Sequence, residues 1–300
     1  MNIVVSGGTG FAGSKLTQSL VQQGHHVYIL TRSPDKHHDT DKTTHVGWLK
    51  DKFAPWEELP DVDAIVNLAG ESLNSGRWTE EKKESIMNSR IDATEAILEI
   101  IRNLKKTPEV LVNASAVGFY GTSKTKTFTE ESNEPGRGFL ADVVVEWENR
   151  AAKARDLGVR TTFIRFGIIL GEEGALQKMI IPYRLMIGGS VGSGEQWVSW
   201  IHVDDVVGLI EFAIKNDKVQ GPLNGTAPHP KRNKDFGKTI GEVLNRPHWM
   251  PAPGFALKAA LGDMSSLLLE GQSVLPKKAM ELGYTFKYPE LEPALQSILK

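Results

Sequence analysis

The stretch FYGTSK holds a tyrosine and a lysine four residues apart, Tyr120 and Lys124. A tyrosine with a pKa of about 10 is a weak base at neutral pH, and a nearby cation favours its phenolate. On one face of a rigid helix, such a pair could transfer a proton to or from a substrate oxygen. Whether Tyr120 and Lys124 can do so depends on the element that carries them.

The N-terminal segment contains a glycine-rich pattern that is typical of phosphate binding. The apolar run IVVS leads into GGTGFAG and then into a helical pattern that starts at Phe11. Gly7, Gly10 and Gly13 permit a tight turn and let the backbone approach a diphosphate. The free N–H groups at the helix start, at Phe11 and Ala12, would then face the phosphates. The alternative is an ordinary glycine-rich turn.

The end of the second predicted strand distinguishes between two nucleotide cofactors. A free ribose 2′-hydroxyl is usually held there by Asp or Glu, about 20 residues past the glycines. This chain instead has Thr31, Arg32 and Ser33, while Asp35 follows in a predicted turn. Because an arginine suits a 2′-phosphate, we predict NADP (NADPH) in preference to NAD. The alternative is a surface arginine at a strand end.

Two further positions belong to the predicted cofactor site. The VNLAG run ends in Leu68, Ala69 and Gly70, where small residues would let a nucleotide lie against the backbone. Arg90 falls on the apolar stripe of a long helical pattern, where a charged group needs a partner or a polar cavity. Arg90 either faces the crevice or forms a buried structural pair, and both interpretations stay open.

The elements that must position these residues alternate between strands and helices. Continuous apolar strands separated by helices indicate a parallel sheet covered on both faces. From residue 221 onward prolines multiply, which favours short helices and turns over further strand–helix units. The predicted strands are 2–6, 26–30, 64–68, 110–115, 160–165 and 196–201, and the predicted helices are 11–23, 79–104, 139–157 and 204–214, the last capped by Asp204.

Composition excludes several classes of function. The 35 basic and 37 acidic residues nearly balance, so we expect neither nucleic acid nor a membrane as a partner. The absence of cysteine excludes disulfides, thiolate catalysis and cysteine metal sites. We expect no metal at the histidines of the polar loop KHHDTDK or its neighbours. The sequence shows no leader and no run of about 20 apolar residues, and predicts a cytoplasmic protein.

Taken together, these stretches resemble the extended short-chain dehydrogenase/reductase (SDR) superfamily, which includes nucleotide-sugar epimerases and dehydratases. More narrowly, the chain is similar to an atypical group of epimerase-family proteins, historically called cell-division-inhibitor-like. The resemblance covers residues 1 to about 215 and the proline-rich C-terminal segment. It is carried by GGTGFAGSKL, VNLAG, NLAGESL, GRWTEEKKESIMNSRIDAT, VLVNASAVGFYG, TTFIRFGIILG and GSGEQWVSWIHVDDVV.

The resemblance implies an α/β fold of the Rossmann type, a doubly wound parallel sheet with a smaller C-terminal substrate-side domain. We place residues 1–168 in the dinucleotide-binding domain, with 196–226 contributing to it, and 169–195 with 227–300 in the smaller domain. The resemblance also implies that Arg165 helps to shape the cofactor crevice and that His202 is structural.

The same resemblance changes the interpretation of FYGTSK. In the family, the catalytic tyrosine starts the helix that follows a Glu-x-x-x-Pro element, and the lysine lies one turn later. This chain has Phe139 and Val143 at those places, and neither side chain can transfer a proton. Tyr120 corresponds instead to the tyrosine of a turn after the preceding strand. Threonines and glycines around Lys124 place it in a predicted surface loop.

Three polar residues remain as catalytic candidates. Ser115 ends the strand VLVNAS, where the resemblance implies a hydroxyl beside the substrate carbonyl. Tyr120 and Glu71 are the alternative proton donors. Alternatively, Ser115 is a strand-end hydrogen bonder and Tyr120 an amphipathic wall residue, which is the interpretation that we favour for Tyr120.

The substrate side departs from the nucleotide-sugar enzymes of the superfamily. Val198 stands where those enzymes often hold the diphosphate with an arginine. Trp197 and Trp200 favour a partly apolar, aromatic wall, although we expect one of them to pack in the core.

The sequence therefore predicts an NADP(H)-binding oxidoreductase or epimerase-like enzyme that acts on an unidentified small molecule, as a monomer or a homodimer. The alternative is a catalytically silent NADP(H)-bound sensor or interaction protein, which the missing dyad favours. An active sugar-nucleotide epimerase is disfavoured by the same absence and by Val198.

Overall fold

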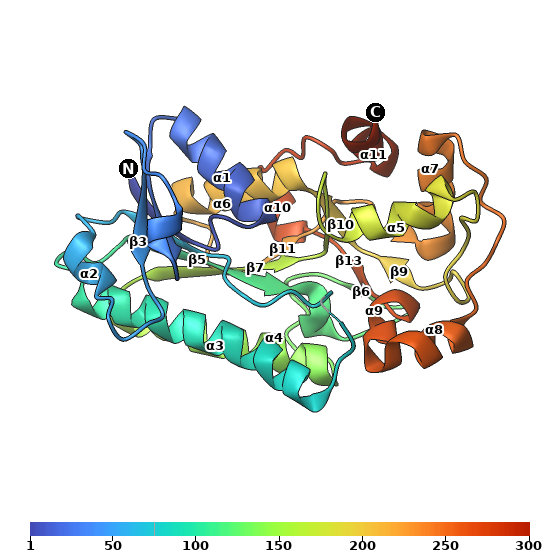
Figure 1. Ribbon diagram of the computed structural model, residues 1–300, viewed down its shortest axis with the longest axis horizontal. Helices are drawn as coiled ribbons and strands as arrows, with labels where there is room; N and C mark the ends of the chain where they lie inside the picture. Colours follow the sequence, from blue (N-terminus) through green and yellow to red (C-terminus); the bar gives the residue numbers. More distant parts are fainter. Residues whose placement is uncertain (75) are drawn as a thin grey trace.

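The computed structural model describes residues 1–74 and 76–300. Within these residues, seven parallel strands form a central sheet in the order β11-β7-β5-β4-β1-β2-β3 (Figure 1). Because β2 and β4 pair with opposite sides of β1, the strand order reverses there, and such a reversal opens a crevice at the carboxyl ends of the strands. The strands are Asn2–Ser6 (β1), His26–Thr31 (β2), Thr43–Gly47 (β3), Ala64–Asn67 (β4), Val110–Ala116 (β5), Arg160–Phe166 (β7) and Gly221–Gly225 (β11).

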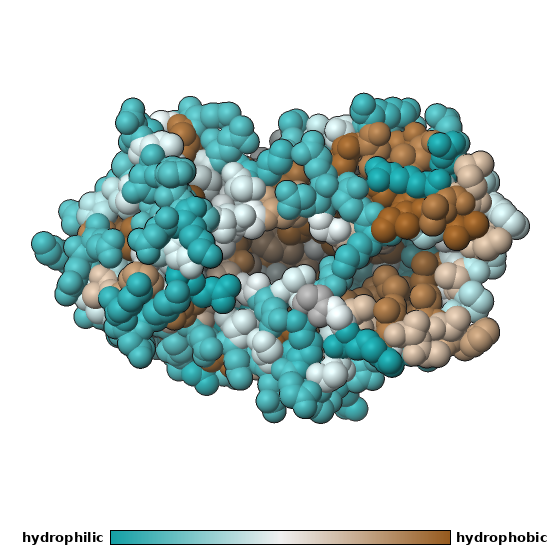
Figure 2. Space-filling model, in the orientation of Figure 1, coloured by the Kyte–Doolittle hydropathy of each residue, from teal (hydrophilic) through white to brown (hydrophobic). Residues whose placement is uncertain are grey.

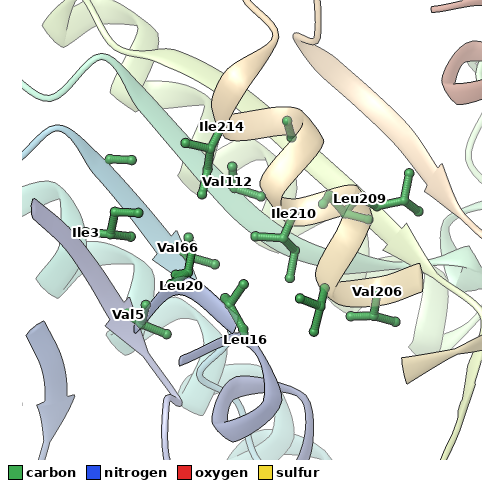
Figure 3. Packing of buried hydrophobic residues seen from close by; sticks show 14 of the residues in the cluster. Ile3, Val5, Leu16, Leu20, Val66, Val112, Val206, Leu209, Ile210 and Ile214 are labelled. Atoms are coloured by element: carbon green, nitrogen blue, oxygen red, sulfur yellow. The ribbon is translucent and has the colours of Figure 1, made fainter. Parts of the chain in front are cut away.

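Helices cover both faces of this sheet, as its continuous apolar strands require (Figure 1). On one face, α1 (Phe11–Gln22) and α6 (Val203–Lys215) point leucine and isoleucine side chains such as Leu16 and Ile210 at the strands (Figure 3). On the other face lie α3 (Glu80–Asn103) and α4 (Phe139–Ala152), with the short α2 (Pro55–Glu58) beside α3. This three-layer arrangement confirms the predicted Rossmann-like fold.

The C-terminal elements form a smaller domain beside the strand ends (Figure 1). Its core surrounds Trp200 and Phe236, both fully buried. Short strands connect it to the first domain: Ile168–Leu170 (β8) pairs with Trp200–His202 (β10), Trp197–Val198 (β9) with Lys231–Arg232 (β12), and Thr127–Phe128 (β6) with Ser273–Val274 (β13). Its helices are Ala175–Arg184 (α5), Asn233–Leu244 (α7), Gly254–Leu261 (α8), Ser266–Leu269 (α9) and Leu291–Leu299 (α11), whereas Lys277–Glu281 (α10) packs beside β11 of the central sheet.

The structure corrects several predicted elements. The sequence predicts neither β3 nor β11, yet both extend the sheet, and β11 lies within a segment where we expected no further strand. The predicted strand 196–201 is two strands, β9 and β10, which pair with different partners. The following helix is capped by His202 rather than Asp204, because the Nδ1 atom of His202 accepts the Asp204 N–H at 3.0 Å.

The described helices are either too short or too polar to cross a lipid bilayer.

Candidate nucleotide-binding and reaction site

In the glycine loop between β1 and α1, backbone segments pack closely against one another. Gly7 has a φ of +70°, and a Cβ there would lie 2.9 Å from the backbone of Leu68 at the end of β4. A Cβ on Gly13 would lie 2.1 Å from the carbonyl oxygen of Gly7, whose oxygen also accepts the Gly10 N–H at 3.0 Å. Since no side chain fits at these positions, the bare backbone forms a cradle of the kind that admits a diphosphate.

The start of α1 leaves its N–H groups available to an anion. Gly10 provides no side-chain cap, and no acidic residue lies in the first turn. The positive end of the helix therefore has no counter-charge of its own, and the N–H groups of Phe11 and Ala12 lack helical partners. The Phe11 ring also lies close to Gly171, where a Cβ would approach it to 2.3 Å. Thus Phe11 connects the loop to the segment after β8.

The end of β2 carries positive charge. Arg32 is exposed directly after Thr31, whose hydroxyl accepts the Ser33 N–H at 3.3 Å. Across residues 1–74 and 76–300, no side chain pairs with the Arg32 guanidinium. The Lys50 ammonium lies 2.5 Å from the Arg32 carbonyl oxygen, so a second cation stands beside it. The sequence analysis missed Lys50 because it follows β3, a strand that was not predicted.

Arg90 supports the turn that ends VNLAG. Its guanidinium donates to the carbonyl oxygens of Ile86 at 2.9 Å and Glu71 at 3.1 Å, and lies 5.1 Å from the ring centre of Trp147. Gly70 packs against the Arg90 side chain. Burial lowers the pKa of Arg90 to about 10, so it remains a cation at neutral pH. The structure thus assigns Arg90 backbone partners, and its contact with a cofactor stays a prediction.

Ser115 lies in a buried polar network at the carboxyl end of β5. Its hydroxyl donates to the carboxylate of Glu148 on α4 at 2.6 Å. Arg165 on β7 donates two hydrogen bonds of 2.8 Å each to the same carboxylate. Ser115, Glu148 and Arg165 are 3%, 7% and 4% exposed, so this ion pair is shielded from water. The sequence analysis missed Glu148, although its place beside the core-facing Trp147 was a usable signal.

Tyr120 extends this network rather than standing free. Its hydroxyl accepts from Arg165 at 3.0 Å and donates to Asn224 on β11 at 2.7 Å. Burial raises the pKa of Tyr120, and the nearby Arg165 charge only partly opposes this. Burial alone would lower the pKa of Arg165, but its bonds to Glu148 raise it above the usual range. Tyr120 is therefore a protonated phenol whose hydroxyl already has two partners, and its catalytic role stays a prediction.

Glu71 occupies a more exposed position after Gly70. Its carboxylate pairs with the Lys82 ammonium and accepts the Ser85 hydroxyl, and these two hydrogen bonds lower its pKa. A carboxyl group with a lowered pKa is ionised at neutral pH and gives up no proton there. Glu71 is thus the weaker of the two proposed proton donors.

The positions expected for the family's dyad lie in an apolar cluster. As predicted, Phe139 starts the helix after the proline element, and Val143 follows one turn later. The Phe139 ring meets Trp78 edge-on at 5.3 Å, while Val143 packs with Trp78 and Ile86. Lys124 is exposed in the predicted loop and does not lie on a helix.

Of the two tryptophans of the substrate side, one is buried in the core and the other is not, as predicted. Trp200 is fully buried in the core of the smaller domain. Trp197 is half-buried, donates to the carbonyl of Lys124 at 3.1 Å, and stacks on the Arg232 guanidinium at 3.8 Å. Val198 is 6% exposed, so its side chain contributes no polar surface there.

The histidines near the N-terminus pair with each other and with a carboxylate. His37 stacks on His45 at 4.7 Å, and the Nδ1 atom of His45 lies 2.9 Å from Asp39. In the described part of the chain, no three or more His, Cys, Asp or Glu side chains gather in a metal-binding arrangement.

A parallel sheet that reverses its order beside a glycine cradle and an uncapped helix start defines a dinucleotide-binding Rossmann protein. The model of the NAD dependent epimerase/dehydratase family matches residues 3–224, and the chain belongs to this family. A second model, for a domain of unknown function, DUF1731, matches residues 252–298.

Known proteins of similar sequence and structure agree with this assignment. The epimerase family protein YfhF of Bacillus subtilis is 48% identical over 299 residues, which are 100% of this chain and 98% of that protein. The human epimerase family protein SDR39U1, solved with NADPH, is 33% identical, with a TM-score of 0.86 over 99% of both chains. MoeE5, solved with UDP-glucuronic acid and NAD, shares the fold at 19% identity, with a TM-score of 0.80 over 99% of this chain and 97% of that one.

Proposed function

We propose that this protein binds NADP(H) and uses it to oxidise, reduce or epimerise a small molecule. The observation that carries the proposal is the closed glycine cradle before an uncapped α1, together with the unpaired Arg32 at the end of β2. The similarity to SDR39U1, whose structure contains NADPH, supports the same cofactor. The acid that would hold a free 2′-hydroxyl is missing from the end of β2, which favours a 2′-phosphate.

Each part of the crevice has a separate task in this proposal. The backbone of the glycine loop and the first turn of α1 hold the diphosphate. Arg32 and Lys50 attract the 2′-phosphate by charge-assisted contacts. When bound, the nicotinamide supplies hydride transfer to or from a substrate carbon. Ser115, at the carboxyl end of β5, is the residue that we propose to orient the substrate oxygen.

This role requires Ser115 to change partners. Its hydroxyl proton now goes to Glu148 at 2.6 Å, so it can accept a hydrogen bond but cannot donate one to a substrate without releasing Glu148. Glu148 would keep its two bonds to Arg165 and remain satisfied during such an exchange. Tyr120 lies beyond Arg165 in this network and carries a phenol proton, and we propose that it donates this proton directly to the substrate, in preference to Glu71.

One observation favours a second candidate function. The apolar contacts of Phe139 and Val143 fill the positions where the family's proton-transfer pair would stand. A protein that binds NADP(H) without turnover, as a sensor or interaction partner, would need the cradle but not this pair.

The cofactor preference is tested by titrating NADPH and NADH while following dihydronicotinamide fluorescence. We expect wild-type protein to bind NADPH at least about tenfold more tightly, since a charge-assisted contact contributes about 1.5 kcal/mol or more. Arg32→Ala should weaken NADPH binding by a similar factor and leave NADH unchanged. Lys36→Ala, an exposed lysine in the next turn, is the matched control.

Equal dissociation constants for the two nucleotides would remove the NADP preference, and binding of neither would remove the function. A panel of carbonyl and enone compounds then separates the two candidates. Tight NADPH binding without oxidation of NADPH by any compound would favour the sensor.

A further inference from the structure

Two short apolar helices of the smaller domain are covered only in part by the rest of the protein. The helices α8 (GFALKAAL) and α9 (SLLL) contain no buried residue, and Phe255 on α8 is 79% exposed. An apolar helix in a globular protein normally buries at least one face. The outer side of α8, with Phe255, is therefore apolar surface that stays in contact with water, while the leucines of α9 are half-buried.

A second uncovered apolar surface lies at the end of α5. Ile181 and Leu185 are 50% and 63% exposed, and Met186 follows them. Trp249 joins this surface, because its indole N–H donates to the Met186 carbonyl at 2.9 Å. Of the ten large apolar side chains that are exposed in residues 1–74 and 76–300, seven fall within 181–187 and 249–255.

These two surfaces face one hollow. Figure 2 shows apolar side chains gathered over α5 and over α8 and α9, on either side of a depression at the right of the molecule. Contiguous apolar surface of this kind marks a ligand groove or an interaction site. The position of the hollow relative to the crevice favours a ligand groove over an interaction site.

The hollow borders the reaction end of the crevice. Asp263, between α8 and α9, pairs with Lys83 on α3 at 2.8 Å. Met264 and Leu267 pack against the cluster that contains Trp78 and Val143. The segment 254–269 therefore extends from the smaller domain to the start of α4, where the family's proton-transfer pair would stand. A ligand in the hollow would be continuous with the proposed nicotinamide site.

Two cations beside Trp197, Arg232 and Lys234, already have partners. Arg232 stacks on Trp197 and donates to the carbonyl oxygens of Lys124 and Glu195. Lys234 pairs with the Glu195 carboxylate at 2.7 Å. The unpaired Arg184 and Lys258 stand on α5 and α8 themselves, among the apolar side chains, which suits an apolar body with at most one polar end.

We propose that the hollow between α5 and α8–α9 binds the substrate, and that this substrate is an apolar carbonyl compound or alcohol, aliphatic or aromatic, without a diphosphate. This inference rests on the proposed NADP(H) function and names the substrate class for that site. A diphosphate would meet the buried Val198 and, next to it, the already paired Arg232 and Lys234, whereas an apolar body would cover side chains that are now in contact with water.

The test uses the full chain with saturating NADPH and the neutral fluorescent probe N-phenyl-1-naphthylamine. We expect saturable binding with a rise in probe fluorescence. Leu185→Asn and Phe255→Ser should each weaken it about tenfold, because each removes apolar surface that the probe would cover. Met280→Asn is the matched control, an apolar residue on α10 that is 53% exposed and lies outside the hollow. NADPH affinity should be the same in all four proteins.

Three results would overturn the proposal. The first is displacement of the probe by UDP-glucose at concentrations where an aliphatic aldehyde has no effect. The second is equal loss of probe binding in Met280→Asn. The third is a fall in molar mass by light scattering in the α5 and α8 variants with unchanged probe binding, which would make the surface an interface between copies. Failure of NADPH binding with retained probe binding would instead contradict the cofactor function alone.

Discussion

The two ends of the crevice are built in different ways. At the proposed nucleotide end, the groups that could contact a ligand belong to the backbone: Gly7 and Gly13 leave room, and the start of α1 offers uncapped N–H groups. At the reaction end, the polar groups belong to side chains, and Ser115, Glu148 and Arg165 satisfy one another in the interior. A backbone cradle remains available to any ligand of the right shape, whereas a closed side-chain network must open before it can act. Binding and turnover are therefore separable properties of this fold.

The largest expected effect comes from breaking the network at the reaction end. Glu148→Leu leaves the Arg165 guanidinium buried without its counter-ion, and such a loss costs about 3 to 5 kcal/mol. Urea unfolding measures the change. The matched control is Glu146→Leu on the same helix, whose half-exposed pair with Arg150 should cost less than about 1 kcal/mol.

NADPH binding by these two variants tests whether the two ends of the crevice are independent. Folded Glu148→Leu protein should still bind NADPH, because the hydrogen bonds of Glu148 go to Ser115 and Arg165 and not to the glycine loop. Equal stability losses in the two variants would show that the buried network does not hold the reaction end together.

The next largest effect belongs to the nucleotide end. Gly13→Ala would place a methyl group 2.1 Å from the Gly7 carbonyl oxygen, so the loop must open. We expect NADPH affinity to fall about 100-fold, which corresponds to an overpacking cost of about 3 kcal/mol expressed in the bound loop. Fluorescence titration measures it. Gly24→Ala is the control, because Gly24 has a φ of +86° and the substitution strains the backbone there, while the added Cβ meets open space away from the loop. Unchanged affinity in Gly13→Ala would exclude the cradle as the phosphate site.

The elements with strong local patterns could be predicted from the sequence. The strand Asn2–Ser6 and the start of α4 at Phe139 lie where the apolar periodicity and the proline element placed them. The strand β11 was missed because GPLNG has poor strand propensity. Its pairing with β7, 59 residues earlier at Gly221 and Thr162, supplies what the local sequence lacks.

In the candidate site too, the features with local sequence signals could be predicted and those that depend on distant partners could not. The glycine spacing and the missing acid after β2 are local signals, and both led to the prediction of an NADP(H) site. The partners of Arg90 and Ser115 are not local: Arg90 bonds to the Glu71 carbonyl, and Ser115 to Glu148 on the next helix. Those contacts depend on how α3 and α4 pack on the sheet. Sequence periodicity placed Arg90 on the inner face but could not identify its partner.

The smallest expected effect tests the junction between the two domains, at His202. Its Nδ1 accepts the Asp204 N–H, so the neutral ring carries its proton on Nε2, which lies 3.3 Å from the Ser297 hydroxyl on α11. Burial lowers the pKa of His202 below its usual 6.5, although Asp204 opposes the shift. The unfolded chain therefore binds this proton more readily than the folded protein does. The contribution of His202 to the free energy of unfolding is fully present above pH 6.5 and is lost as the pH falls toward the folded-state pKa.

His202→Asn keeps a helix-capping side chain without the titration, so its free energy of unfolding in urea should fall less between neutral pH and about pH 5. The exposed His38→Asn is the control. If His202→Asn and wild type lose stability equally over this range, protonation of His202 at the domain junction does not contribute to the acid sensitivity of the fold.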